Sequence, residues 1–155
     1  MMKKLSYKDA PRDWAICFQN DCPLSDRCLR HAVAQLAPST LTHHVTVLPA
    51  ARQGDQCSLF ASTEPVRIAR GMTGIMKGIP SGKATDLRKE LYNIFGSCAH
   101  FYRYRSGRYP VTPELQKSVA RLFHKYGIET EPHYDETTLS YYFRKAPHAT
   151  TQQEA

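Results

Sequence analysis

The sequence predicts an α+β fold that is mainly α-helical, with a cysteine-rich first half and a second half built on three helices. Two observations predict this division. Apolar residues at helical spacing are strongest after residue 82, whereas short β-prone segments and four of the five cysteines lie before it. We therefore expect a cysteine-rich region at residues 1–82, a basic helical region at 83–145 and a disordered tail at 146–155.

Capping and stop signals predict the three helices of the second half. Thr85, Ser97 and Thr112 each precede a run with apolar residues at helical spacing, and each can cap the first turn. Glycines follow these runs and end them. The expected helices run from Thr85 to about Phe95 before Gly96, from Ser97 to Gly107, and from Thr112-Pro113-Glu114 to Gly127.

The first half is expected to combine one helix with short strands. Ser25 can cap a helix whose apolar face ends before Pro38. Residues 44–48 and 66–68 are β-prone and are separated by turn-forming residues, which predicts a hairpin between them. Residues 72–79 keep a helical apolar spacing that predicts a short helix, and residues 139–143 predict a final strand or helix.

The charge of the chain indicates its partners. A formal net charge of +7 and a pI of about 9.3 favour partners that carry negative charge, nucleic acid above all. Residues 97–126 contain six lysines and arginines against Glu114 alone. No apolar run approaches the ~20 residues of a membrane span, and no secretion signal is visible near the start. We therefore expect a cytoplasmic protein without membrane partners.

The cysteines predict a metal site. In a reducing cytoplasm, five cysteines are better explained as metal ligands or buried thiols than as disulfides. A closed structural site needs four ligands, and thiolates suit zinc or an iron–sulfur cluster. Three cysteines are spaced C-x4-C-x5-C, and a fourth follows after a longer gap. The predicted ligands are Cys17, Cys22, Cys28 and Cys57, with zinc as the first choice.

Several alternatives stay open at this site. The Cys22-Pro23 pair is typical of residues beside some iron–sulfur clusters, so such a cluster is the alternative to zinc. His31 or His44 could replace Cys57 as the fourth ligand, and the thiols could instead be ordinary buried cysteines. No glutamate or histidine is placed to activate a metal-bound water, so the expected site is structural. Cys98 is expected to be structural in any case.

One stretch in the second half carries a resemblance to a known family. It reads Ser97-Cys98-Ala99-His100-Phe101-Tyr102-Arg103-Tyr104-Arg105-Ser106-Gly107 and is followed by Thr112-Pro113-Glu114-Leu115. This stretch resembles the recognition-helix region of repressor-type helix-turn-helix domains, with Phe101 and Tyr104 as the core pair and Gly107 as the stop, and the resemblance covers residues 85–126. It implies that the exposed side of the helix faces DNA while flanking cations contact phosphates. The implied nucleic-acid-binding residues are His100, Tyr102, Arg103, Arg105, Arg108 and Lys117.

The tyrosines between these arginines keep a second binding mode open. Tyr102, Tyr104 and Tyr109 could stack on bases of single-stranded DNA or RNA while the arginines follow the backbone. A solvated basic face without a ligand is the simplest alternative.

The chain as a whole also resembles an uncharacterised family of small proteins from anaerobic gut bacteria. The resemblance is carried by Cys17, Cys22-Pro23 and Cys28 near the front and by residues 101–107 near the back. It implies no activity.

Enzymatic chemistry has thin support in the sequence. His133-Tyr134-Asp135-Glu136 could form an acid–base cluster and Cys28 with His31 an activated thiol, but a turn beside Pro132 and an exposed helix face explain both. We therefore expect a nucleic-acid-binding protein rather than an enzyme, in the first place a DNA-binding regulator with a structural cysteine-ligated metal site. The alternatives are a protein-interaction module that has such a site but no specific nucleic-acid binding, and an iron–sulfur redox sensor.

Overall fold

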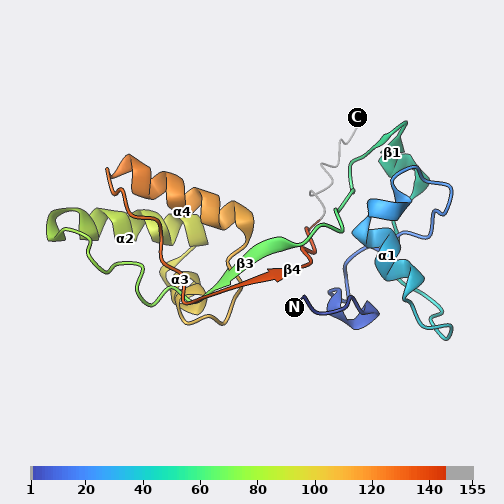
Figure 1. The fold of residues 1–155 in the computed structure, drawn as a ribbon, viewed down its shortest axis with the longest axis horizontal. Coiled ribbons are helices and arrows are strands. Elements are labelled where there is room, and N and C mark those ends of the chain that lie inside the picture. Colours follow the sequence, from blue (N-terminus) through green and yellow to red (C-terminus); the bar gives the residue numbers. More distant parts are fainter. Residues whose placement is uncertain (1, 146–155) are drawn as a thin grey trace, which may run out of the picture. The chain divides into compact units, whose positions relative to one another are not determined.

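The computed structural model describes residues 2–145, which form an α+β fold with four α-helices and two small antiparallel sheets (Figure 1). The α+β class predicted from the sequence is thus confirmed. The chain forms two units. The helical unit is Val66–Ser140, and the described residues of the cysteine unit are 2–65 and 141–145. This division differs from the boundary at residue 82 that the composition predicts. The tail expected at residues 146–155 lies outside the described residues.

Pairing between two strands far apart in the sequence explains where the units divide. Strand β3 (Val66–Arg70) is antiparallel to β4 (Glu136–Ser140), with Val66 opposite Ser140 and Arg70 opposite Glu136. The hairpin expected between residues 44–48 and 66–68 is therefore wrong, because the backbone groups of β3 bond to β4 instead. The chain enters and leaves the helical unit through this one strand pair.

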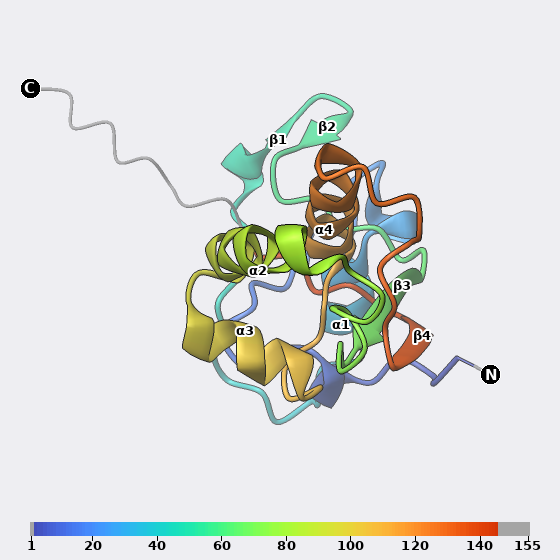
Figure 2. The same ribbon diagram turned by 90° about the vertical axis from the view of Figure 1, so that its left-hand side faces the viewer.

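Three helices form most of the helical unit (Figure 2): α2 (Ser81–Phe95), α3 (Cys98–Arg105) and α4 (Pro113–Lys125). Their apolar residues recur at helical spacing, so each helix turns one side inward. The buried residues that meet in this core are Ala69, Met72, Ile75, Leu87, Leu91, Phe95, Phe101, Val111, Val119, Leu122 and Phe123. Val111 also bonds to Ala69 of β3 through two backbone hydrogen bonds of 3.2 and 2.8 Å, which places the turn before α4 beside the strand.

Most helix ends follow the predicted signals. The Ser97 side chain accepts a hydrogen bond from the backbone N–H of His100 at 3.1 Å, and that of Thr112 accepts from Leu115 at 3.4 Å. Both are N-caps of the kind that satisfies an otherwise unpaired donor. Gly96 ends α2 with a left-handed φ of 92°, which glycine adopts without strain.

Two local predictions are wrong, and proline and glycine explain both. Helix α2 begins at Ser81 rather than at Thr85, because the carbonyl of Pro80 accepts the backbone hydrogen bonds that start the helix. Residues 72–79 form no helix, and turns occupy residues 73–78. Gly78 has a φ of 78° there, which a right-handed helix does not allow.

The cysteine unit contains one short helix and one short hairpin. Helix α1 (Leu29–Gln35) follows Cys28. Ser25 lies in the 3-10 turn before this helix, so the prediction that Ser25 caps it is wrong. Strands β1 (Arg52–Gln53) and β2 (Gln56–Cys57) pair around the Gly54-Asp55 turn. The buried core residues are Trp14, Ile16, Leu29, Val33, Ala34 and Ala61.

The return of the chain at Tyr141 completes this core. Tyr141 and Phe143 pack against it, and the Phe143 ring meets the Trp14 ring edge-on with centroids 5.1 Å apart. The indole N–H of Trp14 donates to the carbonyl of Arg144 at 2.8 Å. The segment 139–143 is therefore divided, because its first residues end β4 and its last residues belong to the core of the cysteine unit.

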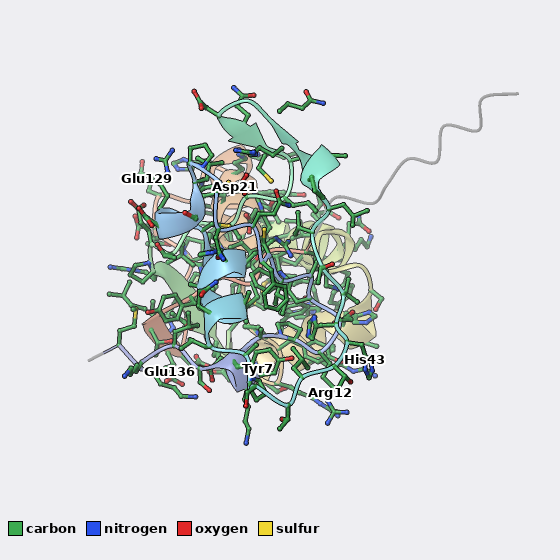
Figure 3. The ribbon with its side chains drawn as sticks, turned by 90° about the vertical axis from the view of Figure 1, so that its right-hand side faces the viewer. Tyr7, Arg12, Asp21, His43, Glu129 and Glu136 are labelled. Atoms are coloured by element: carbon green, nitrogen blue, oxygen red, sulfur yellow. The ribbon has the colours of Figure 1, made fainter. Side chains whose placement is uncertain are left out.

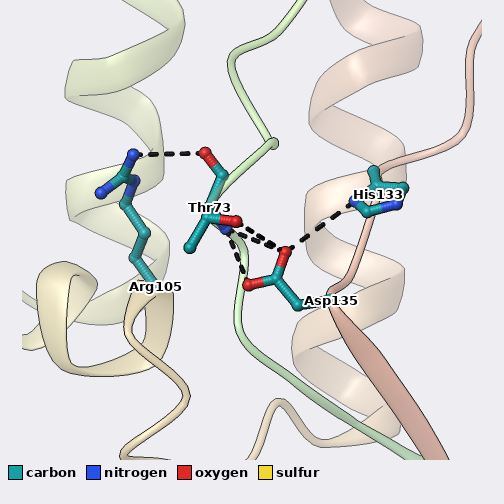
Figure 4. Close-up of polar contacts among 4 residues, drawn as sticks. All are labelled: Thr73, Arg105, His133 and Asp135. Carbon is teal, nitrogen blue, oxygen red and sulfur yellow. Dashed lines mark hydrogen bonds and ion pairs between the residues drawn. The ribbon is translucent and has the colours of Figure 1, made fainter.

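One polar contact fixes the loop after β3 to the segment before β4 (Figure 4). The backbone N–H of Thr73 donates to both carboxylate oxygens of Asp135, at 3.2 and 3.1 Å, and the Thr73 hydroxyl donates to Oδ1 at 2.9 Å. The N–H of Asp135 donates to the carbonyl of Gly71 at 3.0 Å. Gly71 has a φ of 72°, and a side chain there would collide with Asp135. The left-handed φ and the lack of space therefore both require glycine at this position.

We predict that Gly71→Ala destabilises the helical unit by roughly 2–4 kcal/mol, because alanine would have to hold a left-handed φ and because its Cβ would lie 2.9 Å from the Cβ of Asp135. Gly78→Ala is the matched control: its φ is 78°, but nothing lies within 4 Å of an added Cβ, so we expect a loss of about 1 kcal/mol. Urea denaturation followed by circular dichroism measures both. Equal losses would contradict a steric role for Asp135.

Candidate functional site

Four cysteines line one small cavity in the cysteine unit. They are Cys17, Cys22, Cys28 and Cys57, the four predicted metal ligands, and the cavity volume is about 20 Å³. A cavity of this size has room for a group about as large as one water molecule. The structure therefore brings together all four thiols that the sequence analysis singled out.

Backbone hydrogen bonds place these cysteines. The N–H of Cys17 donates to the carbonyl of Arg30 at 3.1 Å, and the N–H of Cys28 donates to the carbonyl of Ser25 at 3.2 Å. Burial raises the pKa of the Cys17 thiol. Within residues 2–145, no group of three or more His, Cys, Asp or Glu side chains is arranged so that it could hold a metal ion as the side chains stand. Metal ligation by the four cysteines stays a prediction.

The two histidines considered as replacement ligands do not line this cavity. The Nε2 atom of His31 lies 2.9 Å from Oδ1 of Asn20. His44 lines a separate hollow of about 770 Å³ together with Tyr7 and His43, which are labelled with side chains in Figure 3. The structure therefore gives no support to a cysteine–histidine ligand set.

Arg30 of α1 lines the same cavity as the cysteines and is only 3% exposed. Its guanidinium donates to the carbonyls of Leu59 and Ala15, each at 2.6 Å, and to that of Arg144 at 3.2 Å. It also lies over the Trp14 ring, 4.2 Å from the centroid. Burial lowers the pKa of this guanidinium, and the neighbouring cysteines oppose that shift. Arg30 was not among the site residues predicted from the sequence.

A second group of charged residues lies in the helical unit, around the turn that follows α3. Arg70 Nη1 donates to the carbonyl of Gly107 at 3.3 Å, and Arg105 Nη2 donates to the carbonyl of Thr73 at 3.2 Å (Figure 4). Arg103 and Arg108 come from α3 and from the turn itself. We call Arg70, Arg103, Arg105 and Arg108 the arginine cluster. Its member Arg70 comes from β3 and was also missed by the sequence analysis.

The arginine cluster has no carboxylate partner within 4.0 Å among residues 2–145. Glu136 stands opposite Arg70 in the strand register but forms no ion pair with it. The guanidinium of Arg103 lies 5.9 Å from the centroid of the Tyr109 ring, and Arg108 is exposed. These cations are therefore not neutralised by the described acidic residues.

The other predicted nucleic-acid-binding residues, His100, Tyr102 and Lys117, do not all lie on the same helix. His100 and Tyr102 lie on the exposed side of α3, with Tyr102 49% exposed and His100 Nδ1 2.9 Å from the Ser97 hydroxyl. Lys117 instead lines a hollow of about 880 Å³ beside α4. No described contact joins Lys117 to the arginine cluster, so the predicted set is divided between two surfaces.

The residues that carry the helix-turn-helix resemblance lie as that resemblance implies. Phe101 is buried, Tyr104 packs partly buried against the same core, and Gly107 has a left-handed φ of 79°. Any short helix that packs one side on a core would show the same pattern, so the helix-turn-helix interpretation stays a prediction.

The acid–base candidates near residue 135 take part in a structural contact. His133 Nδ1 lies 4.0 Å from Asp135 Oδ1, and both carboxylate oxygens of Asp135 accept hydrogen bonds from Thr73. Asp135 therefore has a structural role, but the partner of its carboxylate is Thr73, 62 residues away, rather than the turn beside Pro132.

The fold and these sites define an α+β protein with a cysteine-lined cavity in one unit and an arginine cluster in the other. A family model matches residues 1–143, and the chain belongs to that family, DUF6078, which is described as a family of unknown function. This supports the expected membership of an uncharacterised family, but it supports neither an origin in gut bacteria nor a helix-turn-helix domain. No curated protein and no solved structure matches the chain. No α-helix within residues 2–145 combines the length and apolar character of a membrane span.

Tyr134 lines the same hollow as Lys117, and its buried hydroxyl has no hydrogen-bond partner among the described residues. We predict that Tyr134→Phe raises the free energy of unfolding by up to about 1 kcal/mol near neutral pH, because it removes an unsatisfied hydroxyl. Burial raises the pKa of Tyr134 to about 12, whereas an unfolded tyrosine ionises near pH 10. Between those values only the wild type loses stability through this group, so the advantage of the variant should grow. Urea titrations at pH 8 and pH 11 test this, and a constant difference would contradict it.

Proposed function

We propose that this protein binds nucleic acid through the arginine cluster and the exposed side of α3, and that a metal held by cysteines stabilises its cysteine unit. DNA is the first choice of nucleic acid, and the binding role makes the protein a candidate regulator rather than an enzyme. The observation that carries the proposal is a group of four guanidinium groups that have no carboxylate partner in the described residues.

Guanidinium groups suit phosphate in particular. Each presents a planar fork of N–H donors that matches two phosphate oxygens, and it stays charged at any physiological pH. In the cluster, Arg70 and Arg105 each hold a backbone carbonyl, which fixes where their side chains lie. Such positioning lowers the entropy that must be lost when a phosphate binds.

Exposed aromatic and polar groups beside the cluster favour nucleic acid over a small anion. Tyr102 is 49% exposed on α3, and the Tyr109 ring lies beside Arg103. Such rings can stack on unpaired bases, while His100 and Tyr102 near the start of a helix can reach base edges in a major groove. The proposal thus covers duplex and single-stranded ligands, and binding assays decide between them.

We predict that the double variant Arg103→Gln/Arg108→Gln weakens nucleic-acid binding at least tenfold. Among residues 2–145, neither guanidinium donates a hydrogen bond to the protein backbone, so the fold should persist. For duplex DNA the slope of log K against log salt should fall by about 2, because each phosphate contact contributes about 0.9. Fluorescence anisotropy at several salt concentrations, with duplex DNA, single-stranded DNA and RNA, measures both quantities.

The control is Arg88→Gln, which removes a positive charge from the exposed side of α2 in the same unit. Since Arg88 lies outside the arginine cluster, its loss should change affinity less than threefold. If the wild type binds none of the three ligands, the proposed function is wrong, and a protein-interaction module becomes the better interpretation. If Arg88→Gln weakens binding as much as the double variant, general charge rather than the cluster is responsible.

A further inference from the structure

We propose that Cys17, Cys22, Cys28 and Cys57 bind a thiophilic metal centre as thiolates, and that buried Arg30 is the charge that offsets this anionic centre. The centre is either one zinc ion or an iron–sulfur cluster, since both are held by the same thiolate chemistry. This inference rests on the metal part of the proposed function. It adds a residue, Arg30, and a charge requirement to the site that the sequence predicts.

The first step is the convergence of the thiols. Cys28 precedes α1, Cys57 ends β2, and Cys17 and Cys22 lie in the segment before them, yet all four line one cavity. That cavity is too small for an organic ligand. A structural metal site requires four protein ligands, and four thiols line this one cavity.

The second step is the environment of Arg30. A buried guanidinium is strongly unfavourable unless an opposite charge or a full set of acceptors offsets its lost hydration. Its described partners are three neutral carbonyls and one aromatic ring, with no carboxylate among them. Arg30 also lines a second hollow, and none of the described residues that line it is a carboxylate.

Among the described residues that line the shared cavity, the four thiols are the side chains that can become negatively charged. If the thiols stay protonated, Arg30 has no counter-charge there. If they bind a metal, each gives up its proton to solvent, and four thiolates around a doubly charged zinc ion leave a dianion. An iron–sulfur core with the same charge gives the same result. Arg30 then faces a negative centre, and the two burials offset each other.

A zinc ion and an iron–sulfur cluster require different distances between the four sulfur atoms. A zinc ion with bonds of about 2.3 Å requires sulfurs roughly 3.8 Å apart, so the thiols would have to move together, since they are not arranged to hold an ion as they stand. In a [4Fe–4S] cluster each thiolate binds a different iron, so the sulfurs lie farther apart, but the cavity of about 20 Å³ would have to open to admit the cluster core. Either outcome supports the proposal, and metal analysis distinguishes them.

The test begins with the full chain purified without oxygen and analysed for zinc, iron and sulfide. We expect either one zinc ion per chain without visible absorption, or iron and sulfide with broad visible absorption. Cys57→Ser should lose most of the metal, whereas the matched control Cys98→Ser should keep it, because Cys98 lies in α3 of the other unit. Wild-type protein with substoichiometric zinc and iron would overturn the metal centre.

Arg30 is tested by metal release to a chelator in Arg30→Lys and Arg30→Met. Lysine keeps the charge but cannot make the same set of hydrogen bonds, whereas methionine keeps only the apolar bulk. We expect Arg30→Met to release metal at least tenfold faster than wild type and Arg30→Lys to stay within threefold. Equal acceleration in both variants would mean that the hydrogen bonds, and not the charge, matter.

Trp14 fluorescence reports whether each variant is folded before release begins, since its indole N–H bonds to Arg144 in this core. Nucleic-acid binding is measured on the same samples. If wild type holds metal but binds no nucleic acid, only the binding proposal fails. If it binds nucleic acid but holds no metal, only the metal centre fails, and if both variants of Arg30 release metal like wild type, only the role of Arg30 fails.

Discussion

The ladder between β3 and β4 is the constraint on which the rest of the chain depends. These strands are hydrogen-bonded over five residue pairs, from Val66 with Ser140 to Arg70 with Glu136. The ladder closes the helical unit, and it also returns the chain to the cysteine unit at Tyr141, where Phe143 packs on Trp14. Because β4 also follows the segment that holds Asp135, the same ladder sets the position of the carboxylate that fixes the Thr73 loop.

Local patterns in the sequence predicted what depends on near neighbours and failed where the partner is distant. Helices α3 and α4 are capped by Ser97 and Thr112 as predicted, because a cap and an apolar repeat lie within a few residues of each other. The partner of β3 was wrong, since two neighbouring β-prone segments suggest a hairpin and nothing local indicates a strand at residue 136. The cysteine cavity was anticipated from residue type alone, because few other roles bring several thiols together.

The residues that sequence reasoning missed are both arginines, and the reasons differ. Arg30 occupies a position beside Val33 and Ala34 on the buried face of α1, so a charge within an apolar repeat was the available signal. The sequence around Arg70 carries no such signal. Arg70 joins the arginine cluster only in the folded chain, where its guanidinium donates a hydrogen bond to the carbonyl of Gly107. Burial decides the role of each. A buried guanidinium has lost its hydration and needs a counter-charge from the protein or from a bound metal centre. An exposed guanidinium keeps its hydration and is accessible to an external anion.

The size of the two cores bears on why a metal would be needed in only one unit. The described core of the helical unit contains eleven buried residues, six of them from α2 and α4 at helical spacing, namely Leu87, Leu91, Phe95, Val119, Leu122 and Phe123. The core of the cysteine unit contains six, of which two are alanines, and its helix α1 has only seven residues. Small cores supply little stability, and small units often add disulfides or a metal. The cysteine unit also buries the charge of Arg30. The lost hydration of this charge destabilises the unit, and the few apolar contacts of the unit offset that loss poorly. A thiolate-ligated metal would stabilise the cysteine unit in two ways. It would join the segments that carry the four cysteines, and it would provide the negative charge beside the guanidinium.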